Sequence, residues 1–407
     1  MNIIEGGVTA AKGFKASSCA AGIKYEGRPD MAMVWSEEPC VSAGVYTSNL
    51  VKAACVLWDK KLTAGDSKIS AVVVNAGIAN ACTGEQGLSF CEETAKAVGE
   101  AMNVSEENVL VASTGVIGKQ LPIEKIVNGA GVLCATLEGG IPAGTAASKA
   151  IMTTDTVNKE VAVSVEIGGH TVTVGGMCKG SGMIHPNMCT MLGFITTDCA
   201  IEKKLLQKAL SELVTDTFNM VSVDGDTSTN DTLVVLANSL AGNPVINKEN
   251  EDYETFKKAL FFVMETLAKK IAADGEGATA LLTVKVVNAK TKAQAKTLAK
   301  SVICSSLTKA AVYGHDANWG RILCAFGYSG EVFDPDKVTL SFIGGGEEVI
   351  LFENGTGTDF SEEKATRILS NKEVTVLADF HMGTESATAW GCDLTHEYVS
   401  INADYRS

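Results

Sequence analysis

Apolar and polar positions alternate, or β-branched residues cluster, in nine short stretches of the chain, and each of these stretches predicts a β-strand. Four longer segments have apolar residues at helical spacing instead; in 85–102 the apolar residues share one face and charged residues occupy the other. The predicted strands are 31–35, 71–75, 109–112, 161–167, 171–175, 282–287, 338–343, 348–351 and 374–379, and the predicted helices are 85–102, 202–214, 253–273 and 293–307.

The order of these elements indicates the fold class. Strands outnumber what a chain of alternating βαβ units would use, so we expect an α+β fold, a layered α/β sandwich, rather than a doubly wound parallel sheet. The 407 residues exceed one average domain, which favours two domains or two interleaved lobes. The turn-rich stretch 139–145 separates two structured regions, and we interpret 241–244 as a surface loop; neither divides the chain cleanly.

Charge and hydropathy exclude several classes of protein. The chain has 34 Lys and Arg against 48 Asp and Glu, a net charge of −14, and no Lys/Arg-rich run, which argues against a nucleic-acid partner. No run of about 18 apolar residues occurs, so we expect no membrane-spanning helix and no membrane partner. The N-terminus lacks a basic region followed by an apolar one, so it does not resemble a signal peptide, and we expect a cytoplasmic protein.

Cysteine and histidine usage argues against a metal site. The 12 cysteines have no paired spacing, and we interpret most of them as small buried apolar residues rather than disulfide partners. The five histidines are isolated, and neither CxxC nor HExxH occurs. We therefore expect neither a structural zinc site nor a metalloprotease centre.

The most unusual stretch is 175–198, which is rich in Gly and Met and contains a single lysine, Lys179. It has neither GxxxxGK[ST] nor GxGxxG in a strand-to-helix setting, so a phosphate-binding loop is disfavoured. Taken alone, it is typical of a glycine loop at the end of a strand.

Nine segments that include this stretch match one family in order. The chain resembles the glutamate N-acetyltransferases of arginine biosynthesis, also called ornithine acetyltransferases. Two departures are visible: Ile78 stands where the family usually has Asn, and Cys189 where it usually has Ala. The matching segments are 7–21, 44–57, 75–87, 113–118, 151–156, 179–192, 224–232, 314–321 and 393–407.

The resemblance implies an αββα-like fold and self-cleavage of the Cys189–Thr190 bond. The two fragments, an alpha chain 1–189 and a beta chain 190–407, would share one folded unit and assemble as two alpha and two beta chains. Thr190 would become a new N-terminus whose α-amine, with an ordinary pKa of about 7.7 to 8.0, can serve as the base for its own hydroxyl. Without the resemblance, Thr190 would be interpreted as a buried hydroxyl at a helix start.

The resemblance also implies a ping-pong reaction. Thr190 would take the acetyl group from N2-acetylornithine and pass it to glutamate, and the Thr114 hydroxyl and the Gly115 amide would form the oxyanion hole. By residue type alone, Thr114 and Gly115 fit a turn after a strand equally well. Acetyl-CoA is a candidate second acetyl donor, and no residue in the sequence shows whether the protein uses it. No bound organic cofactor and no metal are implied.

Six residues are implied to contact the substrates. Lys179 suits the α-carboxylate that both substrates share, and Glu276 suits the side-chain ammonium of ornithine. Chain ends are usually frayed, but the match at 393–407 implies that the last residues fold over the site. We expect the segments around Asp231 and Trp319 to support loops rather than to react. The six implied contacts are Thr153, Lys179, Thr190, Glu276, Asn402 and Ser407.

Two alternatives remain open. An N-terminal-nucleophile amidohydrolase or aminopeptidase would share the self-cleavage but would use water as the acceptor, so it would release acetate rather than acetylate glutamate. A non-catalytic binding protein could retain the fold, although the intact set of Thr114, Gly115, Lys179, Thr190 and Glu276 argues against this.

Overall fold

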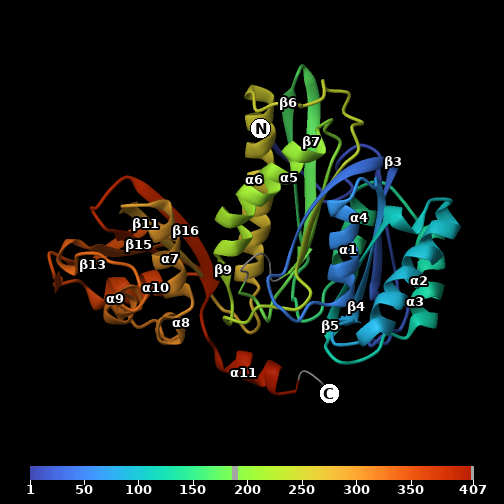
Figure 1. The fold of residues 1–407 in the computed structure, drawn as a ribbon. Coiled ribbons are helices and arrows are strands. Elements are labelled where there is room, and N and C mark those ends of the chain that lie inside the picture. The colour runs from blue at the N-terminus through green and yellow to red at the C-terminus, as the bar shows by residue number, and fades with distance from the viewer. Residues whose placement is uncertain (186–190, 405–407) are drawn as a thin grey trace. The chain divides into compact units, whose positions relative to one another are not determined.

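The computed structural model describes residues 1–185 and 191–404; Cys189, Thr190 and Ser407 lie outside the described residues. The chain forms two compact units that are interleaved along the sequence (Figure 1). Unit 1 consists of Met1–Gly180, Pro186–Asn219 and Thr227–Leu267, and unit 2 of Ser181–His185, Met220–Asp226 and Ala268–Ser407. Each unit therefore contains residues from both sides of the Cys189–Thr190 bond.

Unit 1 is built on a mixed sheet. Its strands in the described residues are β1 (Asn2–Ile4), β2 (Phe14–Cys19), β3 (Met31–Tyr46), β4 (Ile69–Ile78), β5 (Val109–Val116), β6 (Lys159–Ile167), β7 (His170–Lys179), β8 (Leu192–Thr197) and β10 (Thr232–Ala237). Their order is β1-β6-β7-β8-β10-β3-β4-β5, and β2 also pairs with β3. The pairs β4–β5 and β8–β10 are parallel, whereas β3–β4, β6–β7 and β7–β8 are antiparallel.

The long strand β3 joins the two halves of this sheet. Its first half pairs with β2 and β4, and its second half, from Val41 onward, pairs with β10. The register on β4 shifts between Trp35 and Cys40, where the exposed Pro39 has no N–H to donate to a ladder. The strand thus changes partners where its sequence cannot sustain regular pairing.

Helices pack on the sheet of unit 1. The helical elements of this unit are α1 (Ala54–Ala64), α2 (Gly84–Met102), η1 (Glu106–Asn108), α3 (Ile123–Ala135), α4 (Ile141–Ala150), α5 (Lys203–Leu213), η2 (Val214–Asp216), η3 (Phe218–Met220) and α6 (Glu251–Ala273), the last two of which end in unit 2. Helix α1 is fixed to β5 because Trp58 donates from Nε1 to the Val109 carbonyl at 3.1 Å. Helix α6 lies against β7, where Gly176 leaves room for Val263 and Leu267.

Unit 2 has its own sheet, covered by α7. Its elements are β9 (Val221–Ser222), β11 (Leu281–Ala289), α7 (Lys292–Ile303), α8 (Ser306–Tyr313), α9 (Trp319–Gly327), η4 (Pro335–Lys337), β12 (Thr339–Gly344), β13 (Glu347–Glu353), β14 (Thr356–Gly357), α10 (Glu362–Leu369), β15 (Glu373–Asp379), β16 (Glu385–Cys392) and α11 (His396–Ala403). The strand order is β14-β13-β12-β15-β11-β16-β9, and α7 packs on β11 and β16. The rings of Phe326, Phe333 and Phe380 meet edge to face beside this sheet.

The predicted strands all fall on observed strands, and the α+β layered class is confirmed. Three of the predicted helices correspond to α2, α5 and α6, but the prediction of one helix over 293–307 is wrong. Helix α7 ends at Ile303, and Ser305 caps a new helix by accepting from the Thr308 amide. The turn-rich 139–145 is also helical from Ile141 onward, because Pro142 is tolerated in the first turn of α4.

In the part of the chain that the structure describes, no disulfide joins any of the cysteines, and no group of His, Cys, Asp or Glu is arranged to hold a metal ion. No helix in the described ranges has the length and apolar character needed to cross a membrane.

Candidate functional site

Thr114 and Gly115 lie at the end of β5, beside the end of the parallel strand β4. Gly115 has φ +130°, a conformation that side chains other than hydrogen rarely allow. A Cβ there would lie 2.2 Å from the carbonyl carbon of Gly77 and 2.6 Å from the amide nitrogen of Ile78. Only glycine therefore fits, and this close approach of two backbones fixes where Thr114 and the Gly115 amide sit.

The side chains of Asn75 and Asn230 stabilise this strand end by hydrogen bonds. Ser113 donates from Oγ to Asn75 Oδ1 at 2.6 Å, and Asn75 donates from Nδ2 to the Ile78 carbonyl at 2.9 Å. Asn230 donates from Nδ2 to the Ser113 carbonyl at 2.8 Å. Asn230 Nδ2 also donates to the carbonyl of Ala79, in the loop after β4, so the segment around Asp231 supports a loop, as predicted. Ile78 is buried in the core, and Asn75 secures its backbone.

Lys179 is the last residue of β7 and lies next to the end of β5. Its Nζ lies 3.4 Å from Thr114 Oγ1, so the structure brings together two residues that are 65 positions apart in the sequence. Lys179 pairs with Leu192 across the β7–β8 ladder. The strand that begins two residues after Thr190 therefore starts beside Lys179.

Asp155 links Lys179 to another predicted site residue of unit 1, Thr153. Its Oδ1 accepts from Lys159 Nζ and from the Gly180 amide, both at 2.7 Å. Its Oδ2 accepts from the Thr153 amide at 3.1 Å and lies 3.9 Å from Lys179 Nζ. The side chains of Asp155 and Lys159 are fully buried, so this is an ion pair in the interior of the unit.

The surroundings of Asp155 keep it ionised. Burial alone would raise the pKa of this carboxyl, but the charges of Lys179 and Lys159 and its hydrogen bonds lower the pKa to about 2.

Acid should weaken unit 1 through this carboxylate. Because its pKa in the folded protein is about 2, below the ordinary 3.8, the stabilisation is complete above pH 4 and is lost as the pH falls toward 2. The pKa difference corresponds to about 2 kcal/mol of unfolding free energy. Urea unfolding of wild type and Asp155→Asn should show a stability gap that is constant above pH 4 and narrows below it. A gap that stays constant down to pH 2 would contradict this assignment.

Glu276 and Asn402 come together in unit 2. Asn402, on α11, donates from Nδ2 to Glu276 Oε2 at 2.7 Å, and the Glu276 amide donates to the Ser181 carbonyl at 3.0 Å. Gly182 leaves room for the carboxylate, because a Cβ at this position would lie 2.2 Å from Glu276 Cδ. Glu276 is only 6% exposed. The segment that ends in α11 is therefore ordered against a predicted site residue.

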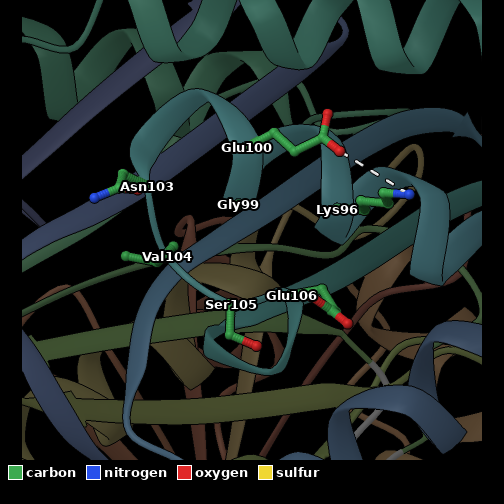
Figure 2. Close-up of a pocket in the computed structure, with 7 residues that line it drawn as sticks. All are labelled: Lys96, Gly99, Glu100, Asn103, Val104, Ser105 and Glu106. Carbon is green, nitrogen blue, oxygen red and sulfur yellow. Dashed lines mark ion pairs between the residues drawn. The ribbon is translucent and has the colours of Figure 1, made fainter.

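A surface pocket of about 340 Å³ lies elsewhere in unit 1, where α2 ends and η1 begins. Figure 2 shows the ion pair of Lys96 and Glu100 in it, with Nζ and Oε1 4.0 Å apart and both side chains exposed. Exposed pairs of this kind contribute little energy. The pocket contains none of the residues that the sequence predicted for the site.

Sequence reasoning missed several residues that organise the site. Asp155 and Lys159 have i,i+4 spacing, but many exposed ion pairs share that spacing, so it did not reveal a buried pair. Asn75 and Ser113 begin the segments 75–87 and 113–118, which match the family, but the match implied no role for either residue. Their function depends on β4 and β5 being neighbours, which is a property of the fold.

The chain is similar to known proteins over nearly its whole length. The ArgJ family model matches residues 15–407. The chain is 50% identical to the arginine biosynthesis bifunctional protein ArgJ of Symbiobacterium thermophilum and 47% identical to that of Caldanaerobacter subterraneus subsp. tengcongensis, with 100% of each chain covered in both cases. It is also similar to the crystal structure of arginine biosynthesis bifunctional protein argJ from Bacillus halodurans. That match has a TM-score of 0.50 and 45% identity, and it covers 52% of this chain and 97% of that one.

Proposed function

The chain belongs to the ArgJ family, and on this premise we propose that it is an arginine-biosynthesis enzyme that transfers the acetyl group of N2-acetyl-L-ornithine to L-glutamate. One observation carries the chemistry of the proposal. A hydroxyl, Thr114, and an amide on a glycine that no other residue can replace, Gly115, lie at one strand end with a lysine ammonium 3.4 Å from the hydroxyl. Preorganised donors of this kind stabilise the oxyanion of acyl transfer.

In this proposal Thr190 is the nucleophile, set free by self-cleavage after Cys189. Its hydroxyl attacks the Cys189 carbonyl, and hydrolysis of the resulting ester leaves fragments 1–189 and 190–407. The coverage of the Bacillus halodurans match supports this step, because 97% of that chain spans only 52% of this one. A relative that consists of two separate chains would match in this way, because each of its chains corresponds to about half of this one.

The mature enzyme then works in two half-reactions. Thr190 attacks the acetyl carbonyl of acetylornithine, with its own α-amine as the base, and ornithine leaves. Glutamate next takes the acetyl group from the acetyl-threonine. Both tetrahedral intermediates place negative charge where the Thr114 hydroxyl and the Gly115 amide can donate to it.

Substrate recognition divides between charges of opposite sign. Lys179 would meet the α-carboxylate common to both substrates, Glu276 the side-chain ammonium of ornithine, and Thr153, Asn402 and Ser407 would complete the contacts. The hydrogen bond from Asn402 Nδ2 to Glu276 Oε2, at 2.7 Å, supports this role because it fixes the position of the Glu276 carboxylate.

Glu276→Gln should therefore weaken acetylornithine more than glutamate, since the amide keeps the hydrogen-bonding shape but loses the charge. We expect KM for acetylornithine to rise by about tenfold or more, as for the loss of one charge-assisted hydrogen bond. KM for glutamate should change by less than about threefold. Steady-state kinetics with each substrate varied in turn would measure this, and equal losses for both would refute the division.

Further parts of the proposal concern donors and assembly. The relatives are named bifunctional, and we propose acetyl-CoA as the second acetyl donor. Transfer through acetyl-threonine needs no bound cofactor. The assembly would hold two alpha and two beta chains, and the protein would act in the cytoplasm.

The test of the function is the fate of the acetyl group. Purified protein is given acetylornithine labelled in the acetyl group, together with glutamate, and the products are separated. Labelled acetylglutamate and free ornithine support the transferase. Labelled acetate that is independent of glutamate would instead support the amidohydrolase alternative, in which water takes the place of the acceptor.

A further inference from the structure

We propose that Lys179 acts in catalysis through Thr114, and that Asp155 is the positioning residue that aims it. The ammonium donates to Thr114 Oγ1, which leaves the hydroxyl proton of Thr114 for the oxyanion. This inference rests on the proposed function and deepens it. It assigns Lys179 a role in the rate of acetyl transfer, in addition to the binding of a substrate carboxylate.

The direction of the hydrogen bond follows from the groups themselves. A lysine ammonium has donors only, so in its 3.4 Å contact with Lys179 the Thr114 oxygen is the acceptor. A hydroxyl has one proton of its own, which then remains to be donated elsewhere. A hydroxyl that accepts from a cation also becomes a stronger donor, because linked hydrogen bonds polarise one another.

Asp155 holds Lys179 by charge rather than by a hydrogen bond. The distance of 3.9 Å from Lys179 Nζ to Oδ2 is too long for one, whereas Lys159 lies 2.7 Å from Oδ1. Amides of Thr153 and Gly180 occupy the same carboxylate. Asp155 therefore attracts the Lys179 ammonium without accepting a hydrogen bond from it, and the ammonium keeps its contact with Thr114.

Burial makes this arrangement effective. The side chain of Lys179 is 9% exposed and those of Asp155 and Lys159 are fully buried. Charges in the interior of a protein interact more strongly than exposed ones, which water and salt screen. The local folding also contributes, because Gly180, the residue after Lys179, is anchored to Asp155 by its amide.

A double-mutant cycle separates this role from direct substrate binding. Lys179→Met, Thr114→Val and the double variant are compared with wild type in the labelled acetyl-transfer assay. Lys179→Met should lower kcat by about 30-fold, which is less than the about 10² to 10³ that removal of one oxyanion donor costs, because the Thr114 hydroxyl is weakened as a donor and not removed. In the Thr114→Val background the same change should cost less than about threefold, since the hydroxyl through which Lys179 acts is already absent.

Full additivity of the two losses in kcat would overturn the proposal. A loss confined to KM would also overturn it, because this is the result expected if Lys179 only anchors a substrate carboxylate. Self-cleavage passes through the same kind of oxyanion. For variants that are cleaved slowly, the rate of self-cleavage is therefore measured in place of kcat. We expect the effects of Lys179→Met and Thr114→Val on this rate to be non-additive in the same way. An inactive wild type would count against the proposed function instead, and this outcome is distinct from additivity in an active enzyme.

Asp155→Asn tests the positioning step. The Asp155→Asn substitution should lower kcat by about tenfold in the otherwise wild-type enzyme. In the Lys179→Met background it should not change kcat. Asp198→Asn is the matched control, because Asp198 is also buried in unit 1 and accepts from two backbone amides, those of Lys12 and Thr173, at the other end of β8. An equal loss of kcat in the control would mean that Asp155 acts only on stability.

Discussion

Replacing Thr190 by alanine is expected to leave a single uncut chain with no acetyl transfer, the largest effect that any one substitution should have on this protein. The variant lacks the hydroxyl that the proposal uses twice, first against the Cys189 carbonyl and later against the acetyl group. Without cleavage there is also no free α-amine to act as base. Both losses follow from one missing oxygen atom.

Denaturing intact-mass spectrometry measures this directly. Wild type should give fragments 1–189 and 190–407, and Thr190→Ala one mass for the whole chain. Thr190→Ser is the control, since it keeps a hydroxyl at the same place and should still cut. Cleavage of the alanine variant would contradict the assignment of Thr190. An uncut wild type would mean that the proposed maturation fails in this chain, whose Cys189 departs from the family pattern.

The pattern of apolar residues predicted the elements well because burial dictates it. Strands β4, β5 and β15 each contain an apolar or alternating run that is visible in the sequence, although β4 and β5 extend beyond the predicted 71–75 and 109–112. The full length of β3 was not predictable, because its middle carries Glu37, Glu38 and Pro39, which belong by composition to a turn. Only its pairing with different strands on either side makes it one strand.

The length favoured two domains or two interleaved lobes, but the bounds of the two units could not be predicted from the sequence. Unit 2 takes short pieces from 181–185 and 220–226. The first lies inside the Gly- and Met-rich stretch 175–198, and no composition change marks the bounds of either piece. Likewise, the prediction of one helix over 293–307 failed at Ser305, where a side-chain cap competes with helix continuation. In each case a local choice was decided by a contact with a residue far along the chain or by a single hydroxyl.

For the candidate site, the family resemblance supplied the residues and the structure supplied their relations. Thr114, Lys179, Glu276 and Asn402 were named from the sequence, and the structure groups the first two in unit 1 and the last two in unit 2. Asp155 was not named, because a buried carboxylate between two lysines cannot be recognised before β7 brings Lys179 to it.

Gly115→Ala is expected to lower kcat by about 10² to 10³, comparable to the removal of an oxyanion donor. The added Cβ would lie 2.2 Å from the carbonyl carbon and 2.3 Å from the carbonyl oxygen of Gly77, so β4 and β5 must separate at this point. The φ of +130° adds strain for any side chain. Both the Gly115 amide and the Thr114 hydroxyl then move away from the position of the developing charge.

Gly118→Ala is the control that isolates the clash. Gly118 also has a positive φ, +78°, but a Cβ there meets nothing within 4 Å, so this variant should lose about 1 kcal/mol of unfolding free energy and little activity. Gly115→Ala should lose about 3 kcal/mol or more, since overpacking adds to the strain. Urea unfolding and the acetyl-transfer assay on both variants measure the difference. Activity in Gly115→Ala equal to that in Gly118→Ala would show that the close approach of Gly77 and Gly115 does not set the geometry of the oxyanion hole.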